Sequence, residues 1–428
     1  MALDTDQKQY HTGGWSAHFI MIVCTLLFVV NYMDRQVFSA VLQPMKIDLG
    51  LTDAQAGGVA TAFTLGMAIF SFPIAWMVDR WSRKKAVGIM ALLWSGFTFL
   101  TGMASSFISL IIPRILVGLG EAGFVPGGNA LISNSYSKES RGKAMGIFNM
   151  AIPLGGAIGV MVGGIISAKY GWRTPFLYFA IPGVILGILA FFMKDYKTVQ
   201  STDSAGSKRG FGQSLGDILK LPTVKWLYPA LGLMSFMSVS TLIWSPALIM
   251  RMLNMNEGQA GTLAGIGGLL AIISVPLGGF LTDLWYKKDH RGRMYISGIC
   301  TIIGAAFLAV AILLKLSTLG IVCFFAYCFV IYMAIPAFAS VYLDIVPPAR
   351  RGLSSGLGIF VQYFLGGAWG PLVVGAISDA LGGGAAGLAT AFLLTSVVGV
   401  IGGLLYFFGA NAYRTDSDKV ANITVMAA

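Results

Sequence analysis

Long apolar runs restrict the fold of this chain more than any other feature. Of its 428 residues 56% are hydrophobic and only 11% are charged, whereas about 25% of the residues of a soluble globular protein are charged. About 20 apolar residues span a bilayer as a helix, and lipid leaves unpaired backbone groups without partners, so each run must be helical. We count twelve runs, near residues 17–43, 54–78, 86–107, 109–132, 143–167, 175–194, 225–250, 258–282, 294–314, 319–343, 353–378 and 386–409. The predicted fold is all-α, a polytopic membrane protein with twelve transmembrane helices.

The distribution of Lys and Arg predicts the orientation of these helices. With the N-terminus inside, 22 of the 29 basic residues fall in cytoplasmic segments and five on the opposite side, as the positive-inside rule requires. We therefore expect both termini in the cytoplasm and a plasma-membrane location, which is the inner membrane in a bacterium. The polar N-terminus shows no cleavable signal peptide. The net charge of +11 follows from this asymmetry, so it does not indicate nucleic-acid binding.

The longest polar stretch, 194–225, separates two sets of six predicted helices. It is basic and rich in Ser and Gly, which is typical of a flexible linker, and its later part, "GQSLGDILK", is predicted as a short amphipathic helix on the membrane face. We assign an N-terminal six-helix bundle to 1–194, a cytoplasmic linker to 195–224, a C-terminal six-helix bundle to 225–414 and a cytoplasmic tail to 415–428.

The two halves resemble each other weakly. "AWMVDRWSRKK" after the second run answers "GGFLTDLWYKKDHRGR" after the eighth, which places Asp79 and Asp283 204 residues apart. In the same way Arg141 in the fifth run and Arg351 in the eleventh are 210 residues apart. Two similar six-helix halves with a central linker are typical of secondary transporters, which bind substrate near the midplane between the halves.

The Asp-Arg and basic sequence after the second run resembles the loop signature of the major facilitator superfamily, although Ala75 and Ser82 replace two of its glycines. "NYMDR", "RILVGLGEAGFVPGGNALISNSY" and "AIPLGGAIG" together resemble the spinster-like branch, whose members are linked to lysolipid, sphingoid-phosphate and other amphipathic-anion transport. The neighbouring anion–cation symporter branch, which carries sugar acids and aromatic acids, has a similar first and fourth helix. The resemblance implies two pseudo-symmetric bundles in which the first and fourth helices line the central path.

Four ionisable residues lie inside predicted helices: Asp34 and Arg35 in the first, Arg114 and Glu121 in the fourth. Each costs at least about 2.5–3.5 kcal/mol at a helix centre, which makes it a candidate functional residue. Arg114 and Glu121 are seven residues apart, so they share a helix face about 10 Å apart along the axis. Asp34 and Arg35 differ by about 100° around their helix, so we expect one to face the cavity and the other to reach the fourth helix. We predict that all four share a watery pocket.

This cluster predicts proton coupling and anion binding. Dehydration favours a protonated carboxyl and a nearby arginine favours an ionised one, so an anion that competes for the arginine links substrate and proton occupancy. Glu121 or Asp34 is expected to carry the proton, and we prefer Glu121 because the small residues of "GLGEAG" leave room for solvent. Arg35 or Arg114 is expected to receive an acidic group. The alternative is a structural ion-pair network that only holds the first helix against the fourth.

Other polar or amphipathic side chains within the runs are weaker substrate-binding candidates, because such residues more often hydrogen-bond between helices. They are Asn31, Tyr32, Asn129, Asn149, Trp244, Ser245, Tyr332, Gln362, Tyr363 and Trp369.

The loop signature after the second run also predicts a cytoplasmic gate. Asp79 is expected to meet helix termini or basic residues such as Arg141, while neighbouring basic residues engage acidic groups at other helix ends. Such pairs would break as the cytoplasmic side opens, which makes a bistable interface. The predicted gate residues are Asp79, Arg80, Arg83, Lys84, Arg141 and Asp283.

The sequence does not indicate an enzyme. Its three histidines are terminal or in a loop, and its four cysteines lie in apolar runs without metal-ligand spacing. We expect a monomeric secondary active transporter, surrounded by membrane lipid, that carries a small-molecule or lipid-like anion with protons and needs no cofactor or metal. The alternatives are an anion–cation symporter-type carrier of sugar acids or aromatic carboxylates, a non-transporting receptor or sensor, and a channel.

Overall fold

The computed structural model describes residues 13–195, 211–347 and 350–421, which form helices and no strand. The first part contains α1 (Gly14–Asp48), α2 (Asp53–Arg80), α3 (Arg83–Gly102), α4 (Phe107–Glu121), α5 (Phe124–Ser135), α6 (Lys138–Asn149), α7 (Ala151–Tyr170) and α8 (Thr174–Ala190). The second contains α9 (Phe211–Leu219), α10 (Pro222–Leu253), α11 (Glu257–Leu269), α12 (Ala271–Lys288), α13 (Gly292–Leu313) and α14 (Thr318–Asp344), and the third contains α15 (Arg351–Gln362), the π-helix η2 (Tyr363–Gly367), α16 (Gly370–Ala380) and α17 (Gly384–Ala421). Eleven helical segments of the described chain are long and apolar enough to cross a membrane, and α8 is a shorter apolar helix. The predicted all-α polytopic fold is confirmed.

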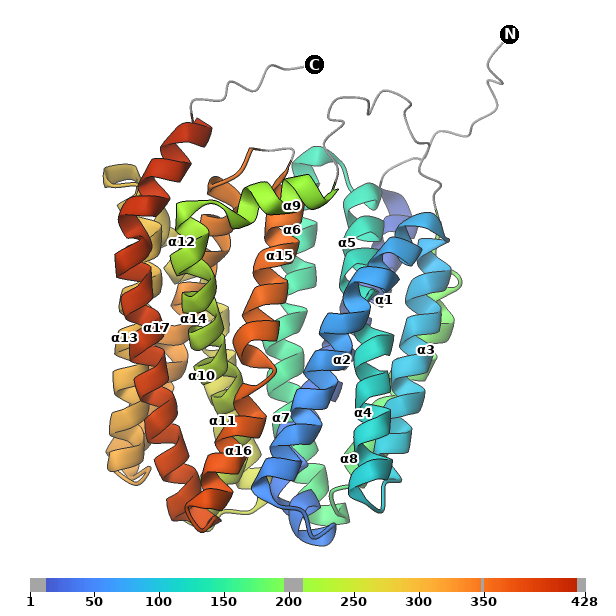
Figure 1. The fold of residues 1–428 in the computed structure, drawn as a ribbon. Helices are drawn as coiled ribbons and strands as arrows, with labels where there is room; N and C mark the ends of the chain where they lie inside the picture. Colours follow the sequence, from blue (N-terminus) through green and yellow to red (C-terminus); the bar gives the residue numbers. More distant parts are fainter. Residues whose placement is uncertain (1–12, 196–210, 348–349, 422–428) are drawn as a thin grey trace.

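The helices form two bundles that lie side by side (Figure 1). In the first, α1 packs against α7 and α8, α3 against α4 and α8, and α2 against α4; in the second, α10 packs against α17 and α13 against α14 and α17. The predicted helix in the linker is present as α9, which lies across the end of the molecule at which α17 ends (Figure 1). We call this the linker end and the opposite one the far end. The exact limits of the predicted domains stay predictions.

Four of the predicted spans are each built from more than one helix. These spans correspond to α4 and α5, to α6 and α7, to α11 and α12, and to α15, η2 and α16. In the first of them, the break leaves Glu121 as the last residue of α4. In the last, η2 is a short π-helical turn, a feature found frequently at functional sites. Three of the four breaks therefore adjoin candidate functional residues, at Glu121, Asn149 and Gln362, and the break between α11 and α12 does not.

Short polar turns fix where helices begin at the far end. Thr52, Ser106 and Asn256 each form a capping box with the residue three positions later, at the starts of α2, α4 and α11. A capping box satisfies backbone N–H groups that have no partner inside the helix. Polar side chains thus begin these apolar helices and satisfy part of the unpaired backbone donors at the membrane boundary.

The two bundles meet toward the far end. There α7 packs against α11, α2 against α16 and α1 against α10. Glycines allow the backbones to touch, since a Cβ added to Gly57 would clash with the carbonyl of Pro371 and one added to Gly164 would clash with that of Glu257. Small residues at helix interfaces allow such close approach in membranes. The seam between the bundles is closed at this end.

Candidate functional site

Four ionisable side chains from α1 and α4 come together inside the N-terminal bundle. Arg35 Nε donates to Glu121 Oε2 at 2.7 Å. Asp34 accepts from Thr98 Oγ1 of α3 at 3.2 Å through its Oδ2. Asp34, Arg114 and Glu121 are at most 1% exposed, and the Arg35 side chain is 13% exposed. The Arg35–Glu121 ion pair therefore joins the first helix to the end of the fourth in a region almost free of solvent.

Aromatic rings contact both arginines of this cluster. The Cζ atoms of Arg35 and Arg114 lie 5.9 and 4.9 Å from the centroid of the Phe63 ring of α2. Tyr32 lies 4.8 Å from Arg35 Cζ, and Phe38 lies 4.8 Å from Arg114 Cζ. A cation within about 6 Å of a ring centroid is attracted to its face. The rings thus stabilise two cations in an apolar region, and Phe63 is shared between them.

The cluster holds hydrogen-bonding groups that have no partner within the described residues. They are Nε and Nη1 of Arg114 and Oδ1 of Asp34, while the side chain of Asn31 interacts with Glu121. An unpaired buried polar group costs about 1–3 kcal/mol, and more when it is charged. Arg114 also interacts electrostatically with both Glu121 and Asp34. The site therefore offers donors and acceptors to an acidic group or a proton.

The glycines around Glu121 are packed against neighbouring helices. A Cβ added to Gly118 would meet the backbone carbonyl of Phe63, and one added to Gly120 would lie 3.0 Å from the backbone nitrogen of Trp94. These residues bring α4 close to α2 and α3. The expectation that small residues leave room for solvent beside Glu121 is therefore wrong, and the direct ion pair is the better ground for choosing this carboxylate.

Five of the weaker substrate-binding candidates divide by bundle, two in the N-terminal bundle and three in the C-terminal bundle. Asn31 is fully buried on α1 and Tyr32 contacts an arginine of the cluster. Trp244 is buried in the C-terminal bundle, where its Nε1 donates to a backbone carbonyl of α16 at 2.9 Å. Tyr332 on α14 and Gln362 at the end of α15 are half-buried. The roles of all five stay predictions.

Three residues that contact the cluster, Phe38, Thr98 and Phe63, were not predicted from the sequence. Phe38 is four residues after Asp34 and so lies on the same face of α1, which is a signal that the sequence contains. Thr98 and Phe63 belong to other helices, and their contacts depend on the rotation of α3 and α2. From the other bundle Tyr363, the first residue of η2, interacts electrostatically with Arg35.

The predicted gate residues lie near helix ends on the linker side, at the ends of α2 and α12, at the start of α3 and in α6. They are Asp79, Arg80, Arg83, Lys84, Arg141 and Asp283, and the side chains of the first two lie outside the described residues. Arg83 is buried and Arg141 is exposed. Asp283 is 72% exposed and lies 3.9 Å from Arg293 of its own bundle. The gate stays a prediction.

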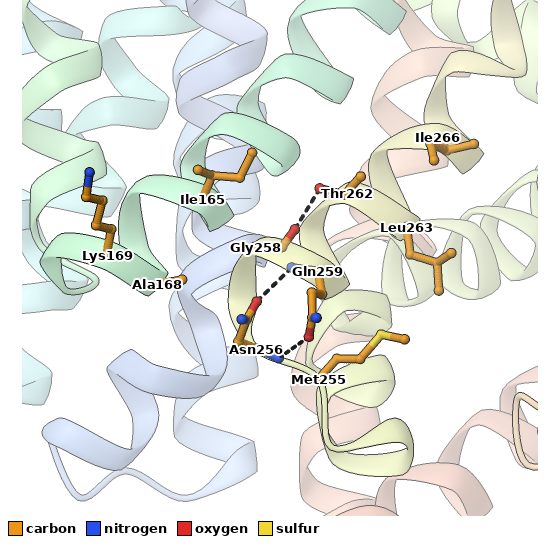
Figure 2. Close-up of a pocket in the computed structure, with 10 residues that line it drawn as sticks. All are labelled: Ile165, Ala168, Lys169, Met255, Asn256, Gly258, Gln259, Thr262, Leu263 and Ile266. Carbon is orange, nitrogen blue, oxygen red and sulfur yellow. Dashed lines mark hydrogen bonds between the residues drawn. The ribbon is translucent and has the colours of Figure 1, made fainter.

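A surface groove of about 660 Å³ lies beside the seam between α7 and α11 (Figure 2). Ile165, Leu263 and Ile266 supply apolar surface, and Lys169 supplies the one cation of the lining. Asn256 and Gln259, the capping pair of α11, also line it (Figure 2). None of the predicted site residues lines this groove. We therefore place the candidate site at the charged cluster and not here.

Two bundles of apolar helices that meet at one end, with ionisable groups buried on the first and fourth helices, define a membrane carrier of the secondary-transporter class. A sequence profile of the Major Facilitator Superfamily matches residues 24–371. The chain belongs to this superfamily, whose members with this fold are transporters and not enzymes.

The relatives and solved structures agree with this assignment. The chain is 27% identical to an MFS-type efflux pump of Mycolicibacterium smegmatis over 97% of both chains. It is 27% identical to the hexuronate transporter of Bacillus subtilis over 90% of this chain and 92% of that one. A bacterial homologue of the human lysosomal transporter spinster, in an inward-facing and unoccupied conformation, has the same fold with a TM-score of 0.85, 22% identity, and coverage of 94% of this chain and 99% of that chain. The predicted superfamily is confirmed, and the resemblance to its spinster-like branch is confirmed by 26% identity to protein spinster of Drosophila melanogaster over 86% of this chain and 63% of that one.

Proposed function

We propose that this transporter carries an organic anion together with protons and works by alternating access. The observation that supports this most directly is the buried Arg35–Glu121 ion pair, bonded at 2.7 Å, beside Arg114, whose Nε and Nη1 have no partner among the described residues. A purely structural pair would leave no cation free of hydrogen bonds next to it. One arginine is held by a carboxylate while the other is available to an acidic group.

Charge balance supports movement of the proton and the anion in the same direction. When all four groups are ionised, two carboxylates offset two guanidiniums and the cluster is neutral. Protonation of Glu121 weakens its bond to Arg35 and gives the cluster one net positive charge. An anion with a single charge then restores neutrality, and a buried net charge is costly without such a partner. Proton and anion therefore favour each other at this site.

The surroundings of the cluster support the proposed substrate class. The rings of Tyr32, Phe38 and Phe63 lie over the arginines and provide apolar contact beside the acidic group. This favours an amphipathic anion such as a lysolipid or a sphingoid phosphate, as the spinster-like resemblance implies. The second candidate is a sugar acid or aromatic carboxylate, and the hexuronate transporter among the relatives supports it.

The orientation that we propose places the linker end in the cytoplasm, in the plasma membrane or the bacterial inner membrane. The excess of Lys and Arg in segments of that side supports it. The gate of Asp79 and its neighbours would then act on the cytoplasmic side, and we expect a monomer to be the functional unit.

A flux assay on reconstituted protein tests the proposal. Thermal shift is first used to screen lysolipids, sphingoid phosphates, sugar acids and aromatic acids for a stabilising ligand. The ligand is then offered to proteoliposomes with and without an imposed pH gradient. We expect saturable uptake that exceeds equilibrium only when the gradient is present. Saturable binding without flux would instead indicate a receptor, and flux that does not saturate would indicate a channel.

A further inference from the structure

Asp53, the first residue of α2, joins the two bundles at the far end. Its side chain is fully buried. Arg251 of α10 donates from Nη1 to Oδ2 at 2.7 Å and from Nη2 to Oδ1 at 2.6 Å, which is the two-pronged geometry of strong arginine–carboxylate pairs. Lys46 of α1 forms a second ion pair with this carboxylate. Ser378 of α16 donates to Oδ2 at 2.6 Å.

A second carboxylate makes the reciprocal contact. Asp379 of α16 accepts from the backbone nitrogens of Asp53 at 2.9 Å and Ala54 at 2.7 Å. These are N–H groups of the first turn of α2, which have no partner inside the helix and attract negative charge. Arg251 Nε also donates to Gln43 of α1 at 2.8 Å. Each bundle thus contributes one carboxylate to the seam and the groups that bind the carboxylate of the other bundle.

The backbones on both sides of these contacts touch. A Cβ added to Gly375 would clash with the carbonyl of Asp53, and Thr61, two turns further along α2, donates to the carbonyl of Ala368 at 2.5 Å. Because the seam is this tight, the contacts of Arg251 and α16 with Asp53 form only when the bundles are closed, and a small separation breaks them together, whereas the Lys46–Asp53 pair lies within the N-terminal bundle. Packed interfaces of this kind have two discrete arrangements and no continuous range.

We propose that Asp53 and Arg251 form a latch that holds the transport path closed at the far end, and that release of this latch is the step that opens the path to that side. The inference rests on the proposed alternating access. It adds a specific residue pair on the side opposite to the loop signature. It also adds a structural connection through which the charged cluster can affect that pair. That connection is α1.

The helix α1 carries Arg35 of the cluster and, eight and eleven residues later, Gln43 and Lys46 of the latch. The separation along a continuous helix is about 12 to 17 Å. Any tilt of α1 that accompanies loading of the cluster therefore moves two latch contacts. Linkage requires that a change in the latch alters ligand affinity by the same factor by which ligand alters the latch.

Distances between spin labels on opposite bundles test the latch. Met103, after α3, and Leu319, in α14, are 62% and 61% exposed at the far end, and each is replaced by Cys for labelling. The four buried native cysteines are replaced by Ala in every sample. Asp53→Asn, Arg251→Gln and the double variant are compared by double electron–electron resonance without substrate. We expect each single variant to raise the ratio of long to short distances at least about tenfold, which corresponds to about 1.4 kcal/mol.

The distance ratio of the double variant is expected to exceed that of the more affected single variant by less than about twofold, because both changes remove the same interaction. A matched control exists at the same end. Arg173 Nη1 donates to Asp48 at 2.7 Å within the N-terminal bundle, and the variants Asp48→Asn and Arg173→Gln are expected to leave the distance ratio unchanged. An unchanged ratio in Asp53→Asn, an equal shift in the control, or additive effects in the double variant would each overturn the latch.

Folding is checked by size-exclusion chromatography and thermal melting. Arg251→Lys keeps the charge but loses the two-pronged bond, so a folded sample with an intermediate shift supports the latch even where Arg251→Gln does not fold, and an unshifted one refutes it. The measurement also separates this inference from the proposed function. A shift in a protein that transports none of the tested anions keeps the latch and refutes the function. Normal proton-driven uptake with no shift refutes the latch alone.

Discussion

Replacing Glu121 by Gln removes one charge from the cluster and keeps its shape. The Gln oxygen remains able to accept from Arg35 Nε, which lies 2.7 Å from Glu121 Oε2 in the native protein. Glu and Gln both accept a bond from the charged guanidinium, and bonds to charged groups contribute about 1.5–3 kcal/mol, so the cost of losing the carboxylate charge lies within the width of that range. We therefore expect Glu121→Gln to lower the free energy of unfolding by about 1–1.5 kcal/mol. This is less than the roughly 3–5 kcal/mol of a buried charge that loses its partner entirely.

The effect on transport is at least as large as the effect on stability. The variant cluster carries a permanent net positive charge, from Arg35 and Arg114 against Asp34 alone. It binds an anion without first taking up a proton. We expect ligand affinity, measured by thermal shift or calorimetry, to become independent of pH. Exchange of external for internal substrate should persist in proteoliposomes, while uptake driven by a pH gradient falls at least about tenfold, a loss of about 1.4 kcal/mol of coupling.

The C-terminal bundle provides a matched control for this experiment. Asp344 forms an ion pair with Arg293 and accepts from Tyr413 Oη at 2.6 Å. Asp344→Asn makes the same chemical change in a carboxylate outside the cluster, so we expect a comparable loss of stability with proton-driven uptake intact. Undiminished gradient-driven uptake by Glu121→Gln would refute the assignment, as would an equal loss in the Asp344 variant. Uptake lost instead in Asp34→Asn would move the proton to the other carboxylate.

Three further outcomes follow from the same contacts. Uptake of a singly charged anion should be electroneutral, so a potassium diffusion potential set with valinomycin should leave the initial rate unchanged while a pH gradient increases it. Phe63→Leu should weaken anion binding and stability by about 1–2 kcal/mol because it removes the ring shared by Arg35 and Arg114, whereas Phe63→Tyr should retain both, as ligand titration and thermal melts will show. Asp416→Ala should cost about 1–2 kcal/mol in thermal melts, since Asp416 accepts from the backbone nitrogen and hydroxyl of Thr223 at the start of α10, and transport coupling should be unaffected.

The sequence predicts the all-α membrane fold well, because the length of its apolar runs alone requires membrane-spanning helices. Burial of Asp34, Arg35, Arg114 and Glu121 in one cluster follows from the same reasoning, since ionisable groups inside a span need partners. The break after Glu121 does not follow, because the apolar pattern continues through it. The break depends on how glycines fit against other helices, which no local periodicity records.

The far end shows a different limit of sequence reasoning. Asp53 follows Thr52 in a short polar turn and is typical of a charge at a helix start, while Lys46 and Arg251 count as ordinary topology charges. Their common role depends on α16, whose Asp379 lies 326 positions after Asp53 in the chain. Tertiary contact over such a distance leaves no pattern in one sequence. The glycines of the seam are the nearest local signal, since small residues suit helix contact.

The charges of the proposed transport cycle are divided unequally between the bundles. The N-terminal bundle holds all four ionisable groups of the cluster, while the runs 226–250, 258–282, 319–343 and 353–378 contain no Lys, Arg, Asp or Glu. Proton coupling and recognition of the acidic group therefore belong to one rigid body. Tyr363, the first residue of η2, interacts electrostatically with Arg35 from the other bundle, so the C-terminal bundle brings an uncharged side chain toward the site. In the proposed cycle the groups that drive transport therefore lie on the N-terminal bundle, which also supplies the rings of Tyr32, Phe38 and Phe63 beside the acidic group, and the C-terminal bundle adds uncharged side chains.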